Sequence, residues 1–481
     1  MTDTKVEFDK AEVLDRAHEE QFEERTFLRI FSLRPHIKPI NFIAFLLAVA
    51  FSICFVVYVG ASQAFVLTDI IKVDSGNIGN ITGSLGLYDE ILSIIMVVLW
   101  GTLSDRIGRR PIYVLGFFLT SISILAFTTA REVYPGLLLL RLLFAAGSSA
   151  CTSMMTAMLG DCLSNKRGRV TGVVGLFSGI GALFAVGVLL PLPARFTSLY
   201  NGDSEKAIKT SFYTVGGVVL CLSVFLWFTL PKDKDRASRR AEASKPKENM
   251  FILLKKGFLA GKDPRVALGY ISSFVARADT VVVSTFISLW VAQYYLDNNL
   301  CESEGKASCP RAYNIASRLS GIAQACAIIG APIFGILSDR LRRTTTTLIA
   351  GVFGIIGCFP FAFNKNPLTG INNFWAVLIG FGQIGMIVTS LILVNGPYVD
   401  EEIRGSVAGV YSFFGALAVM VVNKLGGWLF DEWMQGAPFV LLGICHAIIV
   451  AFALFTRLRE NKLDATEHEM HNHRADEYSL N

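Results

Sequence analysis

The chain has 481 residues, of which 52% are hydrophobic and 17% are charged, with a mean hydropathy of +0.50. Soluble domains carry about 25% charged residues, so this composition excludes an ordinary soluble protein and indicates a chain that lies in a membrane. The formal net charge of +5 is spread along the sequence and is not gathered on one aromatic-studded surface, which argues against a nucleic-acid partner.

Twelve apolar runs follow one another along the chain, and each is long enough to cross a bilayer as a helix of about 20 residues. The predicted spans are 42–66, 79–101, 112–130, 135–160, 170–190, 210–230, 266–293, 314–337, 345–363, 372–397, 407–428 and 435–456. We therefore expect an all-α integral membrane protein made of two six-helix halves. The expected parts are a tail 1–41, a half 42–230, a linker 231–265, a half 266–456 and a tail 457–481.

Lysine and arginine are concentrated in the loops on one side of the predicted spans, and the linker 231–265 is especially basic. By the positive-inside rule, that side and both termini are expected to be cytoplasmic. Within the linker, residues 250–258 form a short amphipathic stretch, which is suited to the inner leaflet but is also compatible with a solvated linker. The sequence does not decide between a plasma membrane and a vacuolar membrane.

A short charged motif occurs twice in the chain. Residues 101–106 read Gly-Thr-Leu-Ser-Asp-Arg and residues 335–340 read Gly-Ile-Leu-Ser-Asp-Arg, each between two apolar runs. This pattern resembles the loop between the second and third spans of major facilitator superfamily transporters. The resemblance implies twelve helices in two related halves that alternate access to a central site.

The resemblance also implies a set of charged contacts that open and close one side of the protein. The family residue that matches Asp105 faces the eleventh span, and the match for Arg109 pairs with an acid that would be Asp161 here. By the repeat, Arg343 would pair with Asp400, although Arg342 stands where the first copy has Gly108. The alternative is that these charges only orient the loops. The candidate gating residues are Gly101, Asp105, Arg106, Gly108, Arg109, Arg110, Asp161, Arg167, Gly335, Asp339, Arg340, Arg343, Asp400 and Arg404.

Ionisable residues within the spans are costly and are therefore functional candidates. Arg277 and Asp279 lie near the middle of the seventh span and point in different directions, because they are two positions apart on a helix. We expect Arg277 to contact an anionic group of the substrate or a coupled carboxylate, and Asp279 to titrate the coupled proton. The alternative is a buried pair that only holds helices together.

The second span carries two further acids, Asp89 and Glu90, and the fourth carries Arg141, which we expect near a proton site. In this fold the second span packs against the eleventh, so Lys424 is expected to pair with one of these acids in an outer gate. One of the two acids is the alternative proton site. Further candidates for the polar lining of the cavity are Gln324, Gln383 and Asn395.

Two features of the predicted outer loops concern covalent modification. Cys301 and Cys309 lie in one loop and form either a disulfide or two free thiols. Asn80 begins a glycosylation sequon close to the membrane.

The leading functional hypothesis is a secondary transporter of a small organic molecule, which uses a proton gradient and needs no metal or other cofactor. No Walker-type sequence is present, and no nucleophile–base arrangement indicates an enzyme. Resemblance to drug-efflux branches implies export by proton antiport. The missing Gly-Pro pair in the fifth span and Arg277 favour uptake of an organic anion or nutrient, and a non-transporting nutrient sensor is a further alternative. The expected partners are the lipid bilayer, the substrate and protons, and the protein is expected to be a monomer.

Overall fold

The computed structural model is a helical membrane protein, and the prediction of twelve membrane-spanning helices is confirmed for the part of the chain that it describes. Two short strands, β1 (Arg25–Phe27) and β2 (Phe31–Leu33), pair in antiparallel fashion outside the bundle. The described residues are 25–27, 31–33, 37–162, 167–231, 250–300, 310–396, 398–399 and 403–479.

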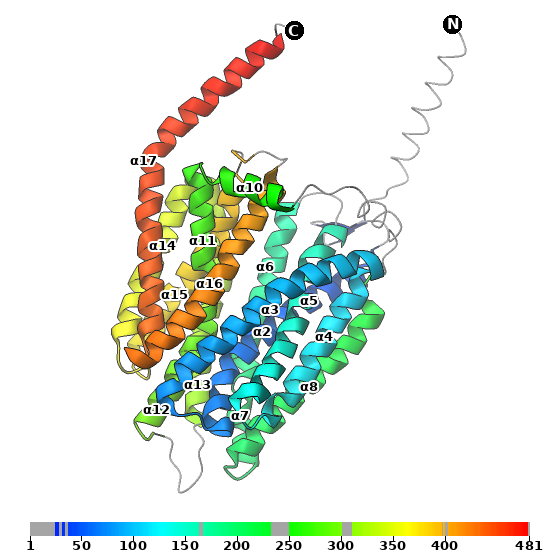
Figure 1. Cartoon of the computed structure of the whole chain (residues 1–481), viewed down its shortest axis with the longest axis vertical. Coiled ribbons are helices and arrows are strands. Elements are labelled where there is room, and N and C mark those ends of the chain that lie inside the picture. The colour runs from blue at the N-terminus through cyan, green and yellow to red at the C-terminus, as the bar shows by residue number, and fades with distance from the viewer. Residues whose placement is uncertain are drawn as a thin grey trace, which may run out of the picture.

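The helices form two bundles that lie side by side, as Figure 1 shows with the first bundle in blue to green and the second in green to red. The first half contains α2 (Pro39–Phe65), η1 (Val66–Ile71), η2 (Ser75–Asn77), α3 (Ile78–Ile107), α4 (Arg109–Ala126), η3 (Phe127–Thr129), η4 (Val133–Leu137), α5 (Leu138–Cys162), α6 (Arg167–Phe184), η5 (Ala185–Leu189), α7 (Leu192–Leu199) and α8 (Ser204–Thr229). The second half contains α11 (Pro264–Val281), η6 (Val282–Phe286), α12 (Ile287–Asp297), α13 (Pro310–Arg340), α14 (Arg343–Phe363), α15 (Ile371–Val394), α16 (Arg404–Glu432) and α17 (Ala437–Ser479).

The two repeated motifs lie at the same end of the molecule, which we call the hairpin face, and the opposite end is the far face. At the hairpin face, α3 turns into α4 through Gly108, whose φ of 105° is a conformation that glycine adopts readily. The equivalent turn before α14 passes through Arg342, which has an extended backbone with φ −61° and ψ 139°. The two copies of the motif therefore turn with different backbone geometry, and the second turn does not need a glycine.

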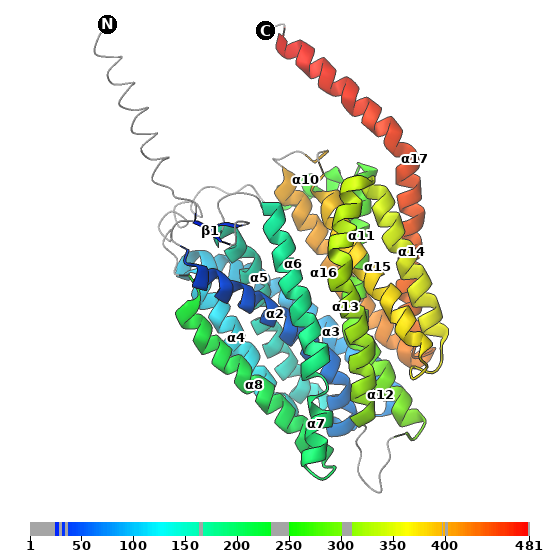
Figure 2. The ribbon, with the colours of Figure 1, turned by 180° about the vertical axis from the view of Figure 1, so that it is seen from behind.

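Two elements extend the second half at the hairpin face. Helix α10 (Met250–Ala260) packs against α16 and α11, and the Tyr270 hydroxyl donates to the Gly257 carbonyl at 2.7 Å. Helix α17 continues beyond the bundle (Figure 2). Before it leaves, Glu460 accepts a hydrogen bond from Thr344 at 2.8 Å and lies 3.7 Å from the Arg342 guanidinium. The described second half therefore includes part of the predicted linker and reaches past residue 456.

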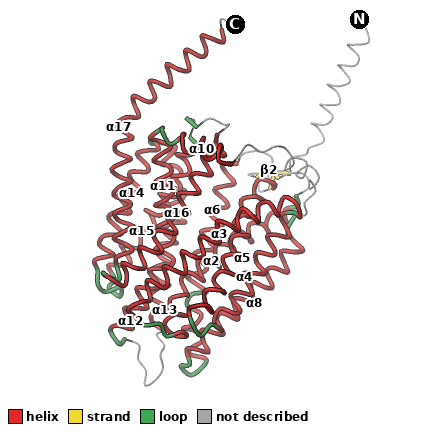
Figure 3. Tube along the Cα trace, viewed as in Figure 1, coloured by secondary structure: helices red, strands yellow, loops and turns green. Residues whose placement is uncertain are grey.

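The two halves meet closely near the far face, where α3 crosses α16 (Figure 3). Gly83 faces the backbone carbonyl of Asn423, and Gly427 faces the carbonyl of Gly79, so that a Cβ at either glycine would overlap the opposite backbone. Each hydrogen bond between the halves whose two partners are described lies toward this face. Towards the hairpin face α3 is open, and Val98 is 56% exposed.

We expect Gly83→Ala to disfavour this closed far face, because the added methyl would overlap the Asn423 carbonyl. Overpacking of this kind costs about 1–3 kcal/mol, which corresponds to roughly tenfold or more in the ratio of open to closed molecules. Distances between spin labels on the far ends of the two halves would measure the ratio. Gly409→Ala, on the facing helix α16, is the matched control, since no heavy atom lies within 4 Å of a Cβ there. An equal response of both variants would contradict the close-contact interpretation.

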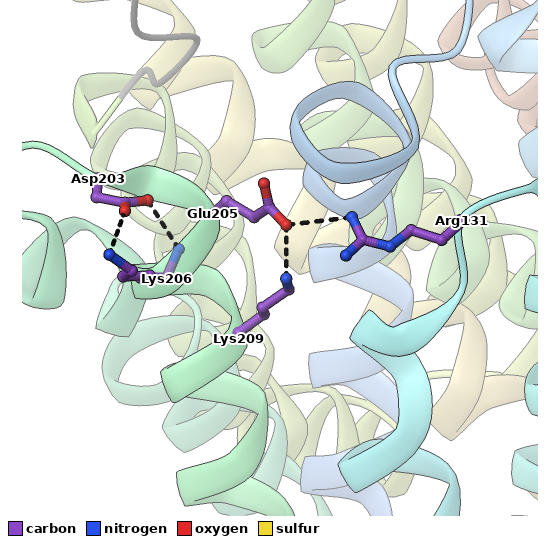
Figure 4. A network of polar contacts seen from close by, with 5 residues as sticks. All are labelled: Arg131, Asp203, Glu205, Lys206 and Lys209. Atoms are coloured by element: carbon purple, nitrogen blue, oxygen red, sulfur yellow. Dashed lines mark hydrogen bonds and ion pairs between the residues drawn. The ribbon is translucent and has the colours of Figure 1, made fainter.

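A separate polar network covers the far face of the first half (Figure 4). Glu205 accepts from Lys209 at 2.5 Å and from Arg131 at 3.3 Å, while Lys206 lies 3.1 Å from Asp203. These side chains are 26–71% exposed, so their ion pairs contribute little to stability. Their importance is that the charges at this end of α8 are already paired.

Candidate functional site

Two opposite charges face each other between the halves. Arg277 is on α11, about 20 Å along the seventh span at 1.5 Å per residue, and it is exposed in spite of this depth. Its stem packs over Gly415 of α16, where a Cβ would lie 2.9 Å from Arg277 Cγ. Among the described residues the guanidinium makes no hydrogen bond or ion pair, but it interacts electrostatically with the carboxyl of Glu90 on α3.

The position of Glu90 follows from the pattern of small residues on α3. Gly79, Gly83 and Gly86 recur at helical spacing and face α16, and Glu90 is the next residue on this stripe. The glycines bring the helices together near the far face. Glu90 follows where α3 becomes more exposed, and it lies close enough to Arg277 of the other half to interact with it electrostatically.

Asp89, the neighbour of Glu90, points into its own half and forms an ion pair with Arg141 of α5. The two side chains are 15% and 10% exposed. Asp89 Oδ1 and Arg141 Nε have no hydrogen-bond partner among the described residues. The charges of the two residues therefore cancel. Asp89 Oδ1 and Arg141 Nε can still accept or donate a further hydrogen bond next to Glu90.

Asp279 does not face the space between the halves. Its Oδ1 lies 3.0 Å from His446 Nε2 of α17, and both side chains are 1% exposed. The imidazole fits because residue 354 of α14 is a glycine, and a Cβ there would overlap the ring. Both partners belong to the second half, so their contact ties α11 to α17 inside one rigid body.

We expect His446→Leu to destabilise the protein strongly, because it leaves the Asp279 carboxyl buried without a partner. A buried group that loses its hydrogen-bond partner costs about 1–3 kcal/mol, and more if it is charged, which should appear as a fall in Tm in detergent. The double variant Asp279→Leu/His446→Leu should regain much of the loss, because an apolar pair leaves no stranded charge. An unchanged Tm together with an altered pH profile of substrate binding would instead make the pair the proton site.

The contact between the halves at the far face includes a cation and an acid. Lys424 donates to Asn80 Oδ1 at 2.7 Å and to Ser84 Oγ at 2.8 Å. Asp431 accepts from the backbone N–H groups of Gly79 and Asn80 at 2.8 and 2.6 Å. This carboxylate therefore caps the N-terminus of α3 from the opposite half, where the helix dipole favours an anion.

These contacts correct one prediction. Lys424 does not pair with Asp89 or Glu90, because α3 and α16 cross with Lys424 level with Asn80 and Ser84, more than one helical turn closer to the far face. The Asn80 amide accepts from Lys424 within α3, and its glycosylation stays a prediction.

The hairpin-face candidates are partly described. Arg109 donates to the Ala157 carbonyl near the end of α5, and Arg110 lies 5.1 Å from the ring centre of Trp227. Arg343 donates to the Ile392 carbonyl at 3.4 Å and lies 6.0 Å from the ring centre of Tyr398. Three further charged candidates are exposed, namely Arg106, Asp339 and Arg340. A Cβ added at Gly101 or Gly335 would have no heavy atom within 4 Å. Arg404 is the first residue of α16.

Several predicted residues cannot be assigned contacts. The side chains of Asp105, Asp161 and Arg167 lie outside the described set, although their backbones are helical. Asp400, Cys301 and Cys309 lie outside the described residues altogether. The pairing of Arg109 with Asp161 and of Arg343 with Asp400 therefore stays a prediction, as does the disulfide.

The polar lining predicted from sequence is divided. Gln324 and Gln383 are 5% and 3% exposed, and Gln383 Oε1 has no hydrogen-bond partner among the described residues. Asn395 is not a cavity residue, because it ends α15 at the hairpin face and its amide donates to the Leu391 carbonyl. Within the described part of the chain, no cluster of three metal-ligating side chains is present.

Three comparisons place this geometry among known proteins. A family model described as Major Facilitator Superfamily matches residues 40–421 and 270–476. The magnetosome protein MamH of Paramagnetospirillum magneticum is 26% identical over 422 residues, which cover 85% of this chain and 91% of MamH. MamZ of Magnetospirillum gryphiswaldense is 24% identical over 421 residues, and the match covers 84% of this chain but only 60% of MamZ. A crystal structure of the nucleoside transporter NupG (D323A mutant) has the same fold, with a TM-score of 0.65, 14% identity and coverage of 86% of this chain and 99% of that chain.

Proposed function

Because the chain belongs to the major facilitator superfamily, we propose that it is a proton-coupled secondary transporter of a small organic anion, and that the proton and the anion move in the same direction. The observation that carries the proposal is the Arg277 guanidinium, which is exposed between the halves with no hydrogen-bond or ion-pair partner among the described residues. A planar guanidinium is well suited to hold a carboxylate or phosphate by two parallel hydrogen bonds.

The coupling follows from competition for one cation. When Glu90 is ionised, its carboxylate neutralises part of the charge of Arg277 and competes with an anionic substrate. When Glu90 binds a proton, the competitor is gone and the anion binds more tightly. The proton and the anion therefore favour each other's binding, as reciprocal linkage requires, and this sign corresponds to co-transport.

Antiport of an anion against a proton would require the two ligands to exclude one another, which this pair of charges does not do. The arrangement therefore supports the first alternative derived from the sequence, proton-coupled uptake of an organic anion, over export by proton antiport. Asp279 is not the coupling acid in this proposal, because it is buried against His446 within one half.

In this proposal the hairpin face is cytoplasmic, because its turns carry Arg106, Arg109, Arg340 and Arg342. The structure then corresponds to the conformation in which the site is open to the cytoplasm and closed at the far face. Rocking of the two halves would exchange the two sides.

The test is thermal stabilisation of the purified protein by small carboxylates and by the uncharged amide of each. A ligand that binds only the folded protein stabilises it by about 2.7 kcal/mol at a hundredfold excess over its Kd. We expect stabilisation by one or more carboxylates, stronger at lower pH, and none by the matched amides. Stabilisation by amides or amines, with no effect of any carboxylate, would overturn the anion proposal.

A further inference from the structure

We propose that Asp69 is a second proton-binding group, which holds a proton while the far face is closed and releases it to that side when the halves separate there. The proton returns to the side from which it came, so it is not transported. Its binding instead changes the balance between the closed and the open conformation. The inference rests on the alternating access of the proposed function, but not on the identity of the substrate.

Asp69 lies in η1, the π-helical end of the first span, directly at the contact with the second half. Its Oδ1 accepts from the Thr68 hydroxyl at 2.7 Å, and its Oδ2 accepts from the Tyr313 hydroxyl of α13 at 3.4 Å. The ring of Tyr313 stacks on Phe65, with centroids 3.7 Å apart and planes at 20°. Tyr313 is 3% exposed, so the closed contact excludes water from one side of the carboxyl.

The described surroundings of Asp69 contain hydroxyl groups and no cation partner. Tyr313 from α13 and Tyr58 from α2 are the neighbouring titratable groups. The charges at the adjacent end of α8 are paired with one another and with Arg131 (Figure 4). An ionised carboxylate is costly in such a place without a cation, whereas a protonated carboxyl can remain there with its hydrogen bonds.

Opening of the far face would remove this environment. Tyr313 would move away with the second half, and water would reach Asp69 and favour the carboxylate. The closed conformation therefore binds one proton more at Asp69 than the open one. By linkage, each unit of pH changes the ratio of closed to open molecules by up to about tenfold over the range in which this proton is exchanged.

Asp431 is the other acid at this contact. In the closed conformation its carboxylate accepts two backbone N–H groups of α3, at Gly79 and Asn80. Asp431 can therefore contribute to a pH response of the closed population, and the Asp69→Asn variant separates that contribution from the contribution of Asp69.

The experiment measures the distance between spin labels at Leu199→Cys and Trp433→Cys, two exposed positions at the far ends of different halves. The background lacks the native cysteines and carries Glu90→Gln, so that the acid between the halves does not titrate. We expect the closed population to rise as the pH falls. Asp69→Asn, which imitates the protonated acid, should favour the closed conformation and lose most of this rise. Asp297→Asn is the matched control, because Asp297 lies at the same face but bonds only within its own half.

A rise of the closed population with acid that is as large in Asp69→Asn as in the background, or a closed population that falls with acid in the background, would overturn the proposal. Tyr313→Phe provides a second check that keeps the stacked ring on Phe65. It removes the hydroxyl that supports the ionised form, so the midpoint of the response should move to higher pH, and an unmoved midpoint would count against Asp69. Failure of the proposed function is seen separately, because the pH dependence of anion stabilisation should persist in Asp69→Asn.

Discussion

Replacement of Arg277 by glutamine is expected to abolish anion binding and transport. A hydrogen bond to a charged group contributes about 1.5–3 kcal/mol, and a guanidinium can make two to one carboxylate. The loss should therefore be a hundredfold or more in affinity. Thermal shifts with the stabilising carboxylate and its uptake into proteoliposomes would measure this loss.

Two further variants define what Arg277 contributes. Arg277→Lys keeps the charge but loses the planar fork, so an intermediate affinity is expected. Arg318→Gln is the matched control, because Arg318 is an exposed arginine in the eighth span of the same half. Its affinity should be unchanged. If Arg277→Gln binds the carboxylate as tightly as the wild type does, the anion is held elsewhere and the proposed site is wrong.

Replacement of Glu90 by glutamine is expected to remove the pH dependence of anion affinity. In the wild type, ionised Glu90 competes for Arg277, so affinity should fall as the pH rises. A pair of opposite charges interacts by a few kcal/mol at an effective dielectric constant of about 20, so the change in affinity can reach roughly a hundredfold. In Glu90→Gln the affinity should stay high at every pH.

Transport should change in a different way from binding in this variant. Without a titrating acid, Glu90→Gln should still equilibrate the anion across a vesicle membrane but should no longer accumulate it when a proton gradient is imposed. Glu132→Gln, an exposed acid at the far face, is the control and should accumulate the anion normally. Retained accumulation in Glu90→Gln would move the proton site to Asp89 or Asp279.

The fold could be predicted from sequence because hydrophobic length identifies a span without any knowledge of its neighbours. The predicted range 42–66 and the observed span Pro39–Ile71 differ only at their ends. The residues missed by the sequence analysis lie at these ends of the spans. Asp69 lies beyond the predicted first span and Asp431 beyond the predicted eleventh, so both acids of the far face escaped notice although each was visible in the sequence.

The contacts of the candidate residues were harder to predict, because they depend on how each helix is rotated and how far it is shifted along its axis. Arg277 and Asp279 were expected to diverge, but the sequence did not show that His446 would meet one and Glu90 the other. Lys424 was correctly predicted to contact α3 from α16, but it meets Asn80 and Ser84 and not the predicted Asp89 or Glu90. The repeated glycines of α3 carry the missing signal, since their stripe leads from Gly79 to Glu90 on one face.

The pairing of buried charges within each half has an electrical consequence. The Asp89–Arg141 and Asp279–His446 pairs each travel with one half, so rocking of the halves transfers no separated charge from these pairs through the membrane field. A full elementary charge that crosses the field is worth about 2.3 kcal/mol per 100 mV. Among the mid-membrane charges described, only Glu90 and Arg277 sit on opposite halves. The membrane potential would therefore act on this conformational change chiefly through that pair and the ligands it holds. If the protein carries a proton and a monovalent anion together, as proposed, the carried charge is nearly zero.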